Sequence, residues 1–189
     1  MIRSILVILL IAFSASVSAQ GLNYNYVQGS YGRIELDTPG LNVDGDGFGL
    51  SASFAIDDNF HVFGEYQTAN MDQGVDLKLL EMGAGYHTSI SNNLDMYANL
   101  GYLKFETDGG ASSADDDAFT VGLGLRGAVS DAVELFGGLD YVDFDNSDSE
   151  TRANAGFVMA LTDTIGVGLK ATFWDDVNIY QLNARLYFD

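Results

Sequence analysis

Apolar and polar residues alternate along most of this chain, so that every second position shares a face. Between residues 47 and 56, Phe48, Leu50 and Phe54 lie on one face, while glycine, serine and alanine occupy the other. Successive side chains of a β-strand point to opposite faces, whereas a helix would scatter the same residues around its circumference. The pattern therefore predicts a strand.

The same alternation recurs along the whole chain. It is found at 24–34, 59–68, 79–88, 93–105, 118–129, 132–142, 155–161, 165–173 and 178–189. About ten strands of roughly ten residues are typical of a transmembrane, antiparallel, up-and-down β-barrel with apolar residues toward lipid and small or polar residues toward the lumen. We predict this all-β fold with about ten strands, and keep eight strands as the alternative count.

A soluble barrel would bury the apolar faces inside. Two features argue against it here. The opposite faces are dominated by glycine with isolated charges, which would make a poor water-exposed surface. The apolar rows are also long enough to cross a bilayer when the strands are tilted.

The connections between the predicted strands alternate between short and long. The short ones are 57–59, 89–93, 130–132 and 162–164, and the others are 35–46, 69–76, 106–117, 143–151 and 175–177. Short turns are typical of the periplasmic side of such barrels. An even number of strands then places both termini on that side, as insertion from the periplasm requires.

Aromatic residues gather near the ends of the outward rows. On the predicted topology, Phe48, Tyr66, Tyr102, Phe119, Tyr141, Phe173 and Tyr180 lie near the loop side, and Phe60, Tyr86 and Phe188 lie near the turn side. Aromatic side chains favour the two interfaces of a membrane. The distribution thus predicts two girdles.

The N-terminus has the features of a secretory signal peptide. Arg3 precedes an apolar run at 5–13, and small residues lead to Ala19. We expect cleavage after Ala19, with residues 1–19 as the signal and 20–189 as a single barrel domain. No later stretch has the roughly 18 consecutive apolar residues of a spanning helix. Export through the periplasm to the outer membrane is the expected route.

Composition narrows the possible partners. The formal net charge is −19, and 47% of the residues are hydrophobic. Such a negative charge disfavours nucleic acids and other partners held through phosphate contacts. The sequence has no cysteine, which excludes disulfides and thiolate metal sites. We expect no cofactor and no resident metal.

The final strand carries a pattern of its own. Tyr180, Leu182, Ala184, Leu186 and Phe188 occupy alternate positions, and Asp189 follows. With the signal peptide and the strand alternation, this resembles the small outer-membrane β-barrel proteins of Gram-negative bacteria, the group of OmpX, Ail and the membrane domain of OmpA. The segment 23–33 is also similar to the start of small barrels once described as quorum factors.

The resemblance implies a role for the last strand. In that group, an alternating strand that ends on an aromatic residue is read by the barrel-assembly machinery, after delivery by periplasmic chaperones. Asp189 departs from the pattern, because the group usually ends on the aromatic residue itself, and ten strands exceed the usual eight.

Several charged residues fall on the faces predicted to point into the lumen. They are Glu65, Glu81, Arg126, Glu134, Asp140, Lys170 and Arg185. A buried charge needs a partner, so we expect pairs of opposite sign. A turn centred on Ser130 would place Arg126 directly opposite Glu134. A loop centred on Gln73 would place Glu65 opposite Glu81, where two like charges would need a cation or a shared proton.

These features lead to two functional hypotheses. If the charged residues fill and rigidify a closed lumen, the protein has a structural role in envelope integrity. If the inward glycines leave space between charged rows, the barrel is a narrow, cation-preferring, porin-like channel. A third hypothesis, adhesion or another surface interaction, would rely on the hairpins at the loop side.

The loop side is strongly acidic. Its carboxylates are Asp37, Asp44, Asp46, Asp108, Asp115, Asp116, Asp117, Asp143, Asp145, Asp148, Glu150, Asp175 and Asp176. A solvated surface is the first interpretation. As a second one, divalent cations held loosely by these oxygens would bridge the barrel to lipopolysaccharide phosphates.

An enzyme is not expected. The only histidines, His61 and His87, fall near the turn-side ends of their strands, away from the loop-side carboxylates. The sequence thus predicts a monomeric outer-membrane barrel in contact with membrane lipid and lipopolysaccharide.

Overall fold

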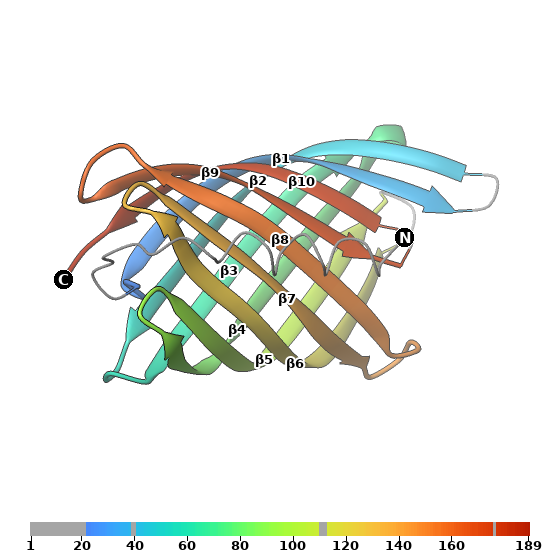
Figure 1. The fold of residues 1–189 in the computed structure, drawn as a ribbon. Helices are drawn as coiled ribbons and strands as arrows, with labels where there is room; N and C mark the ends of the chain where they lie inside the picture. Colours follow the sequence, from blue (N-terminus) through green and yellow to red (C-terminus); the bar gives the residue numbers. More distant parts are fainter. Residues whose placement is uncertain (1–21, 39–40, 110–112, 176) are drawn as a thin grey trace.

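The protein folds into a closed antiparallel β-barrel of ten strands (Figure 1). A computed structural model describes residues 22–38, 41–109, 113–175 and 177–189. The strands are β1 (Tyr26–Thr38), β2 (Leu41–Ala55), β3 (Phe60–Met71), β4 (Val75–Ser91), β5 (Leu94–Asp108), β6 (Ser113–Ser130), β7 (Val133–Phe144), β8 (Glu150–Ala160), β9 (Ile165–Trp174) and β10 (Val177–Tyr187). The predicted count of ten is confirmed, and the alternative of eight is wrong.

Each strand pairs with its neighbours in sequence, and β1 pairs with β10 to close the sheet. The closing register runs from Tyr26 opposite Tyr187 to Leu36 opposite Val177. Closure gives each of the ten described strands two paired neighbours, which is the condition for a sheet to cross a membrane. None of the described helices is long and apolar enough to span a bilayer. The predicted signal peptide lies outside the described residues.

The two ends of the barrel differ. We call the end with the connections 56–59, 92–93, 131–132 and 161–164 the turn end, and the opposite end the loop end. The start of β1 and the last residue both lie at the turn end, on the left in Figure 1. There Asn25 accepts a hydrogen bond from the Phe188 amide, so the two ends of the described chain are held together.

The outer surface carries the predicted apolar rows. Phe48, Leu123 and Leu182 are each exposed over 60% or more of their surface. Aromatic rings on neighbouring strands touch, as Tyr102 and Phe119 do toward the loop end and Phe60 and Tyr86 do toward the turn end. An outward belt of this kind suits contact with lipid rather than water.

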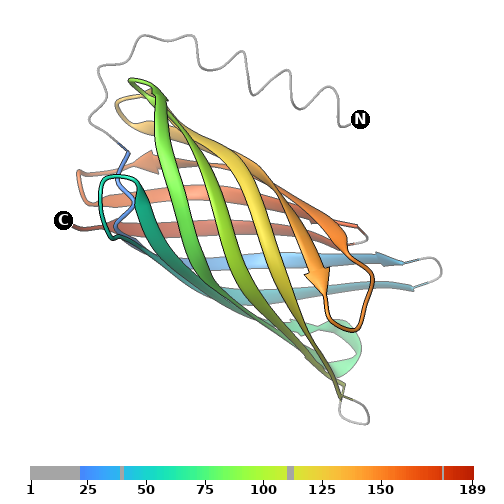
Figure 2. The ribbon, with the colours of Figure 1, turned by 90° about the horizontal axis from the view of Figure 1, so that it is seen from below.

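The strands are longer than a bilayer requires. A tilted membrane strand needs about 9–11 residues, whereas β4 has 17 and β6 has 18. Most of the segments predicted as long loops are therefore strand. For example, 35–46 belongs largely to β1 and β2, and 69–76 is interrupted only by the 3-10 turn η2 (Asp72–Gly74). In Figure 2 the ends of β5 and β6 reach past β7, which pairs with β6 no further than Ala118.

In the part of the strands beyond the apolar belt, apolar side chains face inward and charged side chains face outward. On β4, Leu77 and Leu79 point inward while Lys78 is exposed, whereas further along the strand Glu81 points inward and Met82 is exposed. The apolar face thus changes from outside to inside between the belt and the loop end. Because an apolar interior and a charged exterior suit water, this part of the barrel has the character of a soluble barrel.

Candidate functional site

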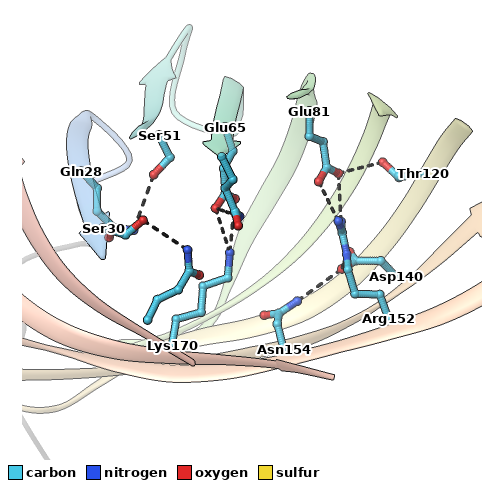
Figure 3. Close-up of polar contacts among 12 residues, drawn as sticks. Gln28, Ser30, Ser51, Glu65, Glu81, Thr120, Asp140, Arg152, Asn154 and Lys170 are labelled. Atoms are coloured by element: carbon cyan, nitrogen blue, oxygen red, sulfur yellow. Dashed lines mark hydrogen bonds and ion pairs between the residues drawn. The ribbon is translucent and has the colours of Figure 1, made fainter. Parts of the chain in front are cut away.

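The middle of the lumen is crossed by a group of paired charges (Figure 3). Arg152 on β8 forms an ion pair with Glu81 on β4, in which Nη1 lies 2.8 Å from Oε2 and Nη2 donates a hydrogen bond to Oε1 at 2.9 Å. Its Nε also lies 3.1 Å from Asp140 Oδ2 on β7. Thr120 donates to Glu81, and Asn154 donates to Asp140. One guanidinium thus contacts two carboxylates from two different strands.

A second pair lies beside it. Lys170 Nζ on β9 is 3.2 Å from Glu65 Oε2 on β3, and Gln67 donates to the same carboxylate. Glu65 does sit opposite Glu81 in the β3–β4 register, as expected. The cations that these two glutamates were expected to need are side chains of the barrel itself. Each has its own cation, because the curvature of the barrel brings β8 and β9 across from β3 and β4.

A third group lies toward the turn end. Arg126 on β6 makes a two-bond pair with Glu134 on β7, at 2.7 and 2.8 Å. Arg185 Nη1 on β10 is 3.4 Å from the same carboxylate, and its Nε donates to Gln28 at 2.9 Å. The group links β6 and β7 to β1 and β10, the two strands that pair to close the barrel at its seam.

The register of the Arg126–Glu134 pair differs from the prediction. Arg126 lies opposite Phe136, and Glu134 lies opposite Ala128. The cause is a β-bulge between Ala128 and Ser130, which shifts the pairing and leaves a two-residue turn. The ion pair is therefore diagonal across the two strands, a separation that these long side chains can reach.

These charges are buried from solvent. The side chains of Arg126 and Glu81 are 7% and 8% exposed, and that of Lys170 is 20% exposed. Burying a charge is costly unless a partner and further hydrogen bonds offset the loss of water. Here the acidic side chains contact cationic side chains in each group.

Sequence reasoning missed Arg152, the central residue of this network. The apolar row of β8 was taken to start at Ala155, although Ala153 continues it toward the loop end. Extending the row back to Ala153 would have placed Arg152 on the lumen face beside Asn154.

Aromatic rings cover several of the inward glycines. A side chain at Gly124 or Gly138 would collide with the ring of Tyr97. Gly83 is covered in the same way by Phe63, and Gly156 by Phe136. Glycine is required at these positions because aromatic rings lie directly on the backbone. The rings fill the lumen next to the charge groups.

The turn end of the lumen is closed by Tyr24, which precedes β1. Its ring stacks on His87 with 3.7 Å between centroids, and its hydroxyl donates to Asp95 at 3.3 Å. His61 lies against the same ring. The two histidines are thus buried in the lumen near the turn end, as the strand positions predicted.

The loop end of the lumen is closed by apolar side chains. One cluster is Ile34, Val43, Ala69, Met71 and Ile179, and the other is Leu79, Leu103, Ala118, Val142 and Trp174. Val177 packs against both clusters, and Phe144 stacks on Trp174. Leu103 and Val142 have no exposed surface. Apolar side chains packed in this way exclude water from the loop end of the lumen.

Between Tyr24 and the apolar clusters lies a polar cavity of about 180 Å³, which is only partly enclosed. The charge groups line it, together with Ser53 and Asn99. Within the described residues, Ser53 Oγ and Asn99 Oδ1 are buried without a hydrogen-bond partner. A smaller cavity of about 50 Å³ lies between the charges and Trp174. Polar walls with unpaired atoms suit ordered water.

The predicted C-terminal row lies on the outer surface. Tyr180, Leu182, Ala184 and Leu186 point away from the lumen. Phe188 follows the end of β10, and its ring packs against Phe54 of β2 with 5.4 Å between centroids. Asp189 is exposed. The row therefore meets lipid along the seam of the barrel.

The acidic residues of the loop side are mostly on strands rather than loops. Asp44 and Asp46 belong to β2, and Asp115 and Asp117 to β6. Asp44 pairs with Arg33, and Asp116 accepts hydrogen bonds from Asn146 and Ser147. In the described ranges, no group of three or more histidine or acidic side chains is arranged to hold a metal ion.

Comparisons with known proteins agree with the architecture. A family model described as outer membrane protein beta-barrel domain matches residues 5–185. The translocator domain of the autotransporter NalP from Neisseria meningitidis has a TM-score of 0.50 at 10% identity, covering 98% of this chain and 96% of that one. At that identity the likeness shows the fold alone.

Smaller barrels also match, with lower scores. Neisserial surface protein A has 18% identity and a TM-score of 0.43, covering 89% of this chain and 100% of that one. Ail of Yersinia pestis has 13% identity and a TM-score of 0.42, covering 88% and 99%. No curated protein sequence matches the chain.

Proposed function

The chain belongs to the family of outer membrane protein β-barrel domains, and on this premise we propose that it is an integral barrel with a structural role in envelope integrity. The family fixes the outer membrane as its location. The single observation that carries the structural role is the filled lumen. Tyr24 closes the turn end, paired charges cross the middle, and two apolar clusters close the loop end.

A narrow channel is the second candidate. The polar cavity of about 180 Å³ favours it, because a space lined by charges could take up small ions. Cation preference has less support than the sequence suggested, since Arg152, Lys170, Arg126 and Arg185 neutralise the acidic side chains. The proposed structural role does not depend on conduction.

We infer no enzymatic activity. His61 and His87 are packed against Tyr24 at the turn end, where the ring covers them. A general base has to reach a proton on a bound substrate, and these side chains contact each other and the tyrosine instead.

Partners follow from the membrane position. The outward apolar belt supports contact with lipid, and the charged exterior beyond the belt supports contact with lipopolysaccharide headgroups, with divalent cations as bridges to Asp44 or Asp115. The row from Tyr180 to Phe188 supports recognition by the barrel-assembly machinery. Adhesion is a weaker candidate, resting only on the hairpins at the loop end.

Loss of the protein tests the structural role. Cells that lack it are expected to become sensitive to detergent and to release periplasmic protein, and expression of the intact barrel is expected to restore the wild-type behaviour. An unchanged envelope in such cells would count against the proposal.

A further inference from the structure

The segment just before β1 folds back into the turn end of the lumen. Tyr24 is 6% exposed, although it lies outside the sheet. Its ring stacks on His87 at an interplanar angle of 12°, and the guanidinium carbon of Arg126 lies 4.6 Å from the centre of the same ring. The ring therefore covers the polar cavity on the side of the turns.

Besides the Tyr24–Asp95 hydrogen bond, four polar contacts with other described residues hold this segment in place, and one of them is donated by the Ala55 amide to Asn25 Oδ1 at 2.8 Å. Arg126 Nη2 donates to the Asn23 carbonyl at 2.8 Å, and Asn23 Nδ2 donates to the Phe188 carbonyl at 3.1 Å. The Phe188 amide donates to the Asn25 carbonyl at 3.2 Å. Because the segment lies before β1 and takes no part in strand pairing, it can open without unfolding the barrel.

The tyrosine rests on two histidines in direct contact. His61 Nδ1 and His87 Nδ1 are 3.2 Å apart, which is a hydrogen-bond distance. One proton can lie between the two nitrogens, so the contact survives when the rings are neutral or carry one charge. When both rings are protonated, two N–H groups point at each other and two positive charges meet, so the contact must break.

The surrounding charges act on this pair from every side. Asp95 on β5 is engaged by Tyr24 and by Ser89, and Asp57 lies in the 56–59 turn. The cations are Arg126 on β6 and Arg185 on β10, which share Glu134 on β7. A second imidazolium would therefore add positive charge beside Arg126, and movement of the segment would relieve it.

We propose that residues 22–25 form a latch that acid opens. With at most one proton on the His61–His87 pair, Tyr24 stays stacked and narrows the opening of the cavity. With both histidines protonated, the latch leaves the mouth and the cavity of about 180 Å³ becomes accessible from the turn end. This switch goes beyond the structural role, because the apolar clusters at the loop end stay closed in both states.

Spin labels would test the latch directly. The sequence contains no cysteine, so Leu22→Cys and Asp163→Cys give a clean pair, one on the latch and one in the exposed 161–164 turn. Electron–electron distance measurements on the refolded barrel are expected to give a narrow distribution near pH 8. Well below the usual histidine pKa of about 6.5, the distribution should broaden and shift to longer distances.

Matched variants distinguish protonation of the histidines from other causes of broadening in acid. With His61→Asn and His87→Asn, which keep a polar atom near each contact but cannot take up a proton in this range, the narrow distribution should persist in acid. With Tyr24→Ala it should be broad at both pH values. A heat-dependent shift in gel mobility verifies that each variant is a folded barrel.

Three results would overturn the latch. One is a narrow distribution in acid for the otherwise unaltered protein. Another is acid broadening that persists in the double asparagine variant. The third is an Asp95→Asn variant that is already broad near pH 8, which would assign release to the loss of the Asp95 charge instead. None of these results bears on whether the barrel serves the envelope.

Discussion

Arg152 on β8 and Glu81 on β4 form an ion pair across the lumen, with nitrogen–oxygen distances of 2.8 and 2.9 Å. Strands β5, β6 and β7 separate the two partners in the sheet. Backbone pairing connects each strand only to its neighbours, so this side-chain pair braces the barrel in a direction that the sheet cannot. Asp140 shares the same guanidinium and draws β7 into the brace.

Replacing Arg152 with leucine should destabilise the barrel strongly. The change would leave Glu81 and Asp140 buried without their cation, and removing one partner of a buried pair typically costs about 3–5 kcal/mol. Urea unfolding of the refolded protein in lipid vesicles would measure the free-energy difference.

Two controls define this effect. Lys104→Ala breaks a pair with Glu106 in which both side chains are about 40% exposed, so a loss below about 1 kcal/mol is expected. The double variant Arg152→Met with Glu81→Met should recover part of the loss, because Glu81 is then no longer an unpaired charge. Equal losses for Arg152→Leu and Lys104→Ala would contradict the bracing role.

The change of facing along β4 predicts where the membrane ends. Lys78 and Leu80 both point outward, two residues apart, but Lys78 belongs to the charged exterior and Leu80 to the apolar belt. In vesicles, Lys78→Cys should react with a water-soluble maleimide, and Leu80→Cys should be protected. Reaction of both cysteines in vesicles, or of neither, would contradict this boundary. As a control, both cysteines should react in unfolded protein without detergent.

The strand count and the facing of the belt could be predicted because each depends only on local alternation. Because successive side chains alternate between the two faces, Phe48 lies outside and Glu81 inside whatever the exact bounds of their strands. The sequence pattern predicts loops at the loop end because apolar residues there face the lumen and charged residues face outward, the reverse of the belt. Leu77 and Leu79 form a short inward row between charged residues, and such a row resembles the polar loops of a barrel unless its phase is followed from the belt.

The partners across the lumen could not be predicted from the sequence. Glu65 and Lys170 meet because of the curvature of the closed sheet, which no pattern of neighbouring residues encodes. The Arg126–Glu134 register also depended on a bulge that shifts one strand against the other. The signal for Arg152 was present in the alternation of β8 and was overlooked.

The last aromatic residue of the alternating row, Phe188, is expected to be needed for rapid assembly. Phe188 packs on Phe54 at the seam, whereas Asp189 is exposed beyond β10. Phe188→Ala should slow assembly by purified barrel-assembly machinery, because it removes the aromatic end of the alternating row. Deleting Asp189 should leave the rate unchanged. A slower rate after that deletion, or an unchanged rate for Phe188→Ala, would overturn this assignment.

The 56–59 turn predicts a pH dependence. Asp57 Oδ1 accepts hydrogen bonds from the backbone amides of Asn59 and Phe60, both at 2.8 Å, and these bonds hold the pKa of Asp57 below its usual 3.8. Because the folded pKa is lowered, the contribution to stability is present above about pH 4 and is lost as the pH falls through the folded pKa. Asp57→Ala should therefore lower the urea midpoint at pH 7 but not at pH 2. An equal loss at both pH values would contradict the charge-based explanation.

The central claim is that the lumen is closed, and electrical recording tests it most directly. Refolded protein in planar lipid bilayers at neutral pH should give no stable conductance steps, because Tyr24, the charge groups and the apolar clusters lie in series along the lumen. A variant with Tyr24, Leu103 and Trp174 all replaced by alanine serves as the positive control and should conduct if it folds. Stable, cation-selective steps from the unaltered protein would contradict the closed lumen and favour the channel.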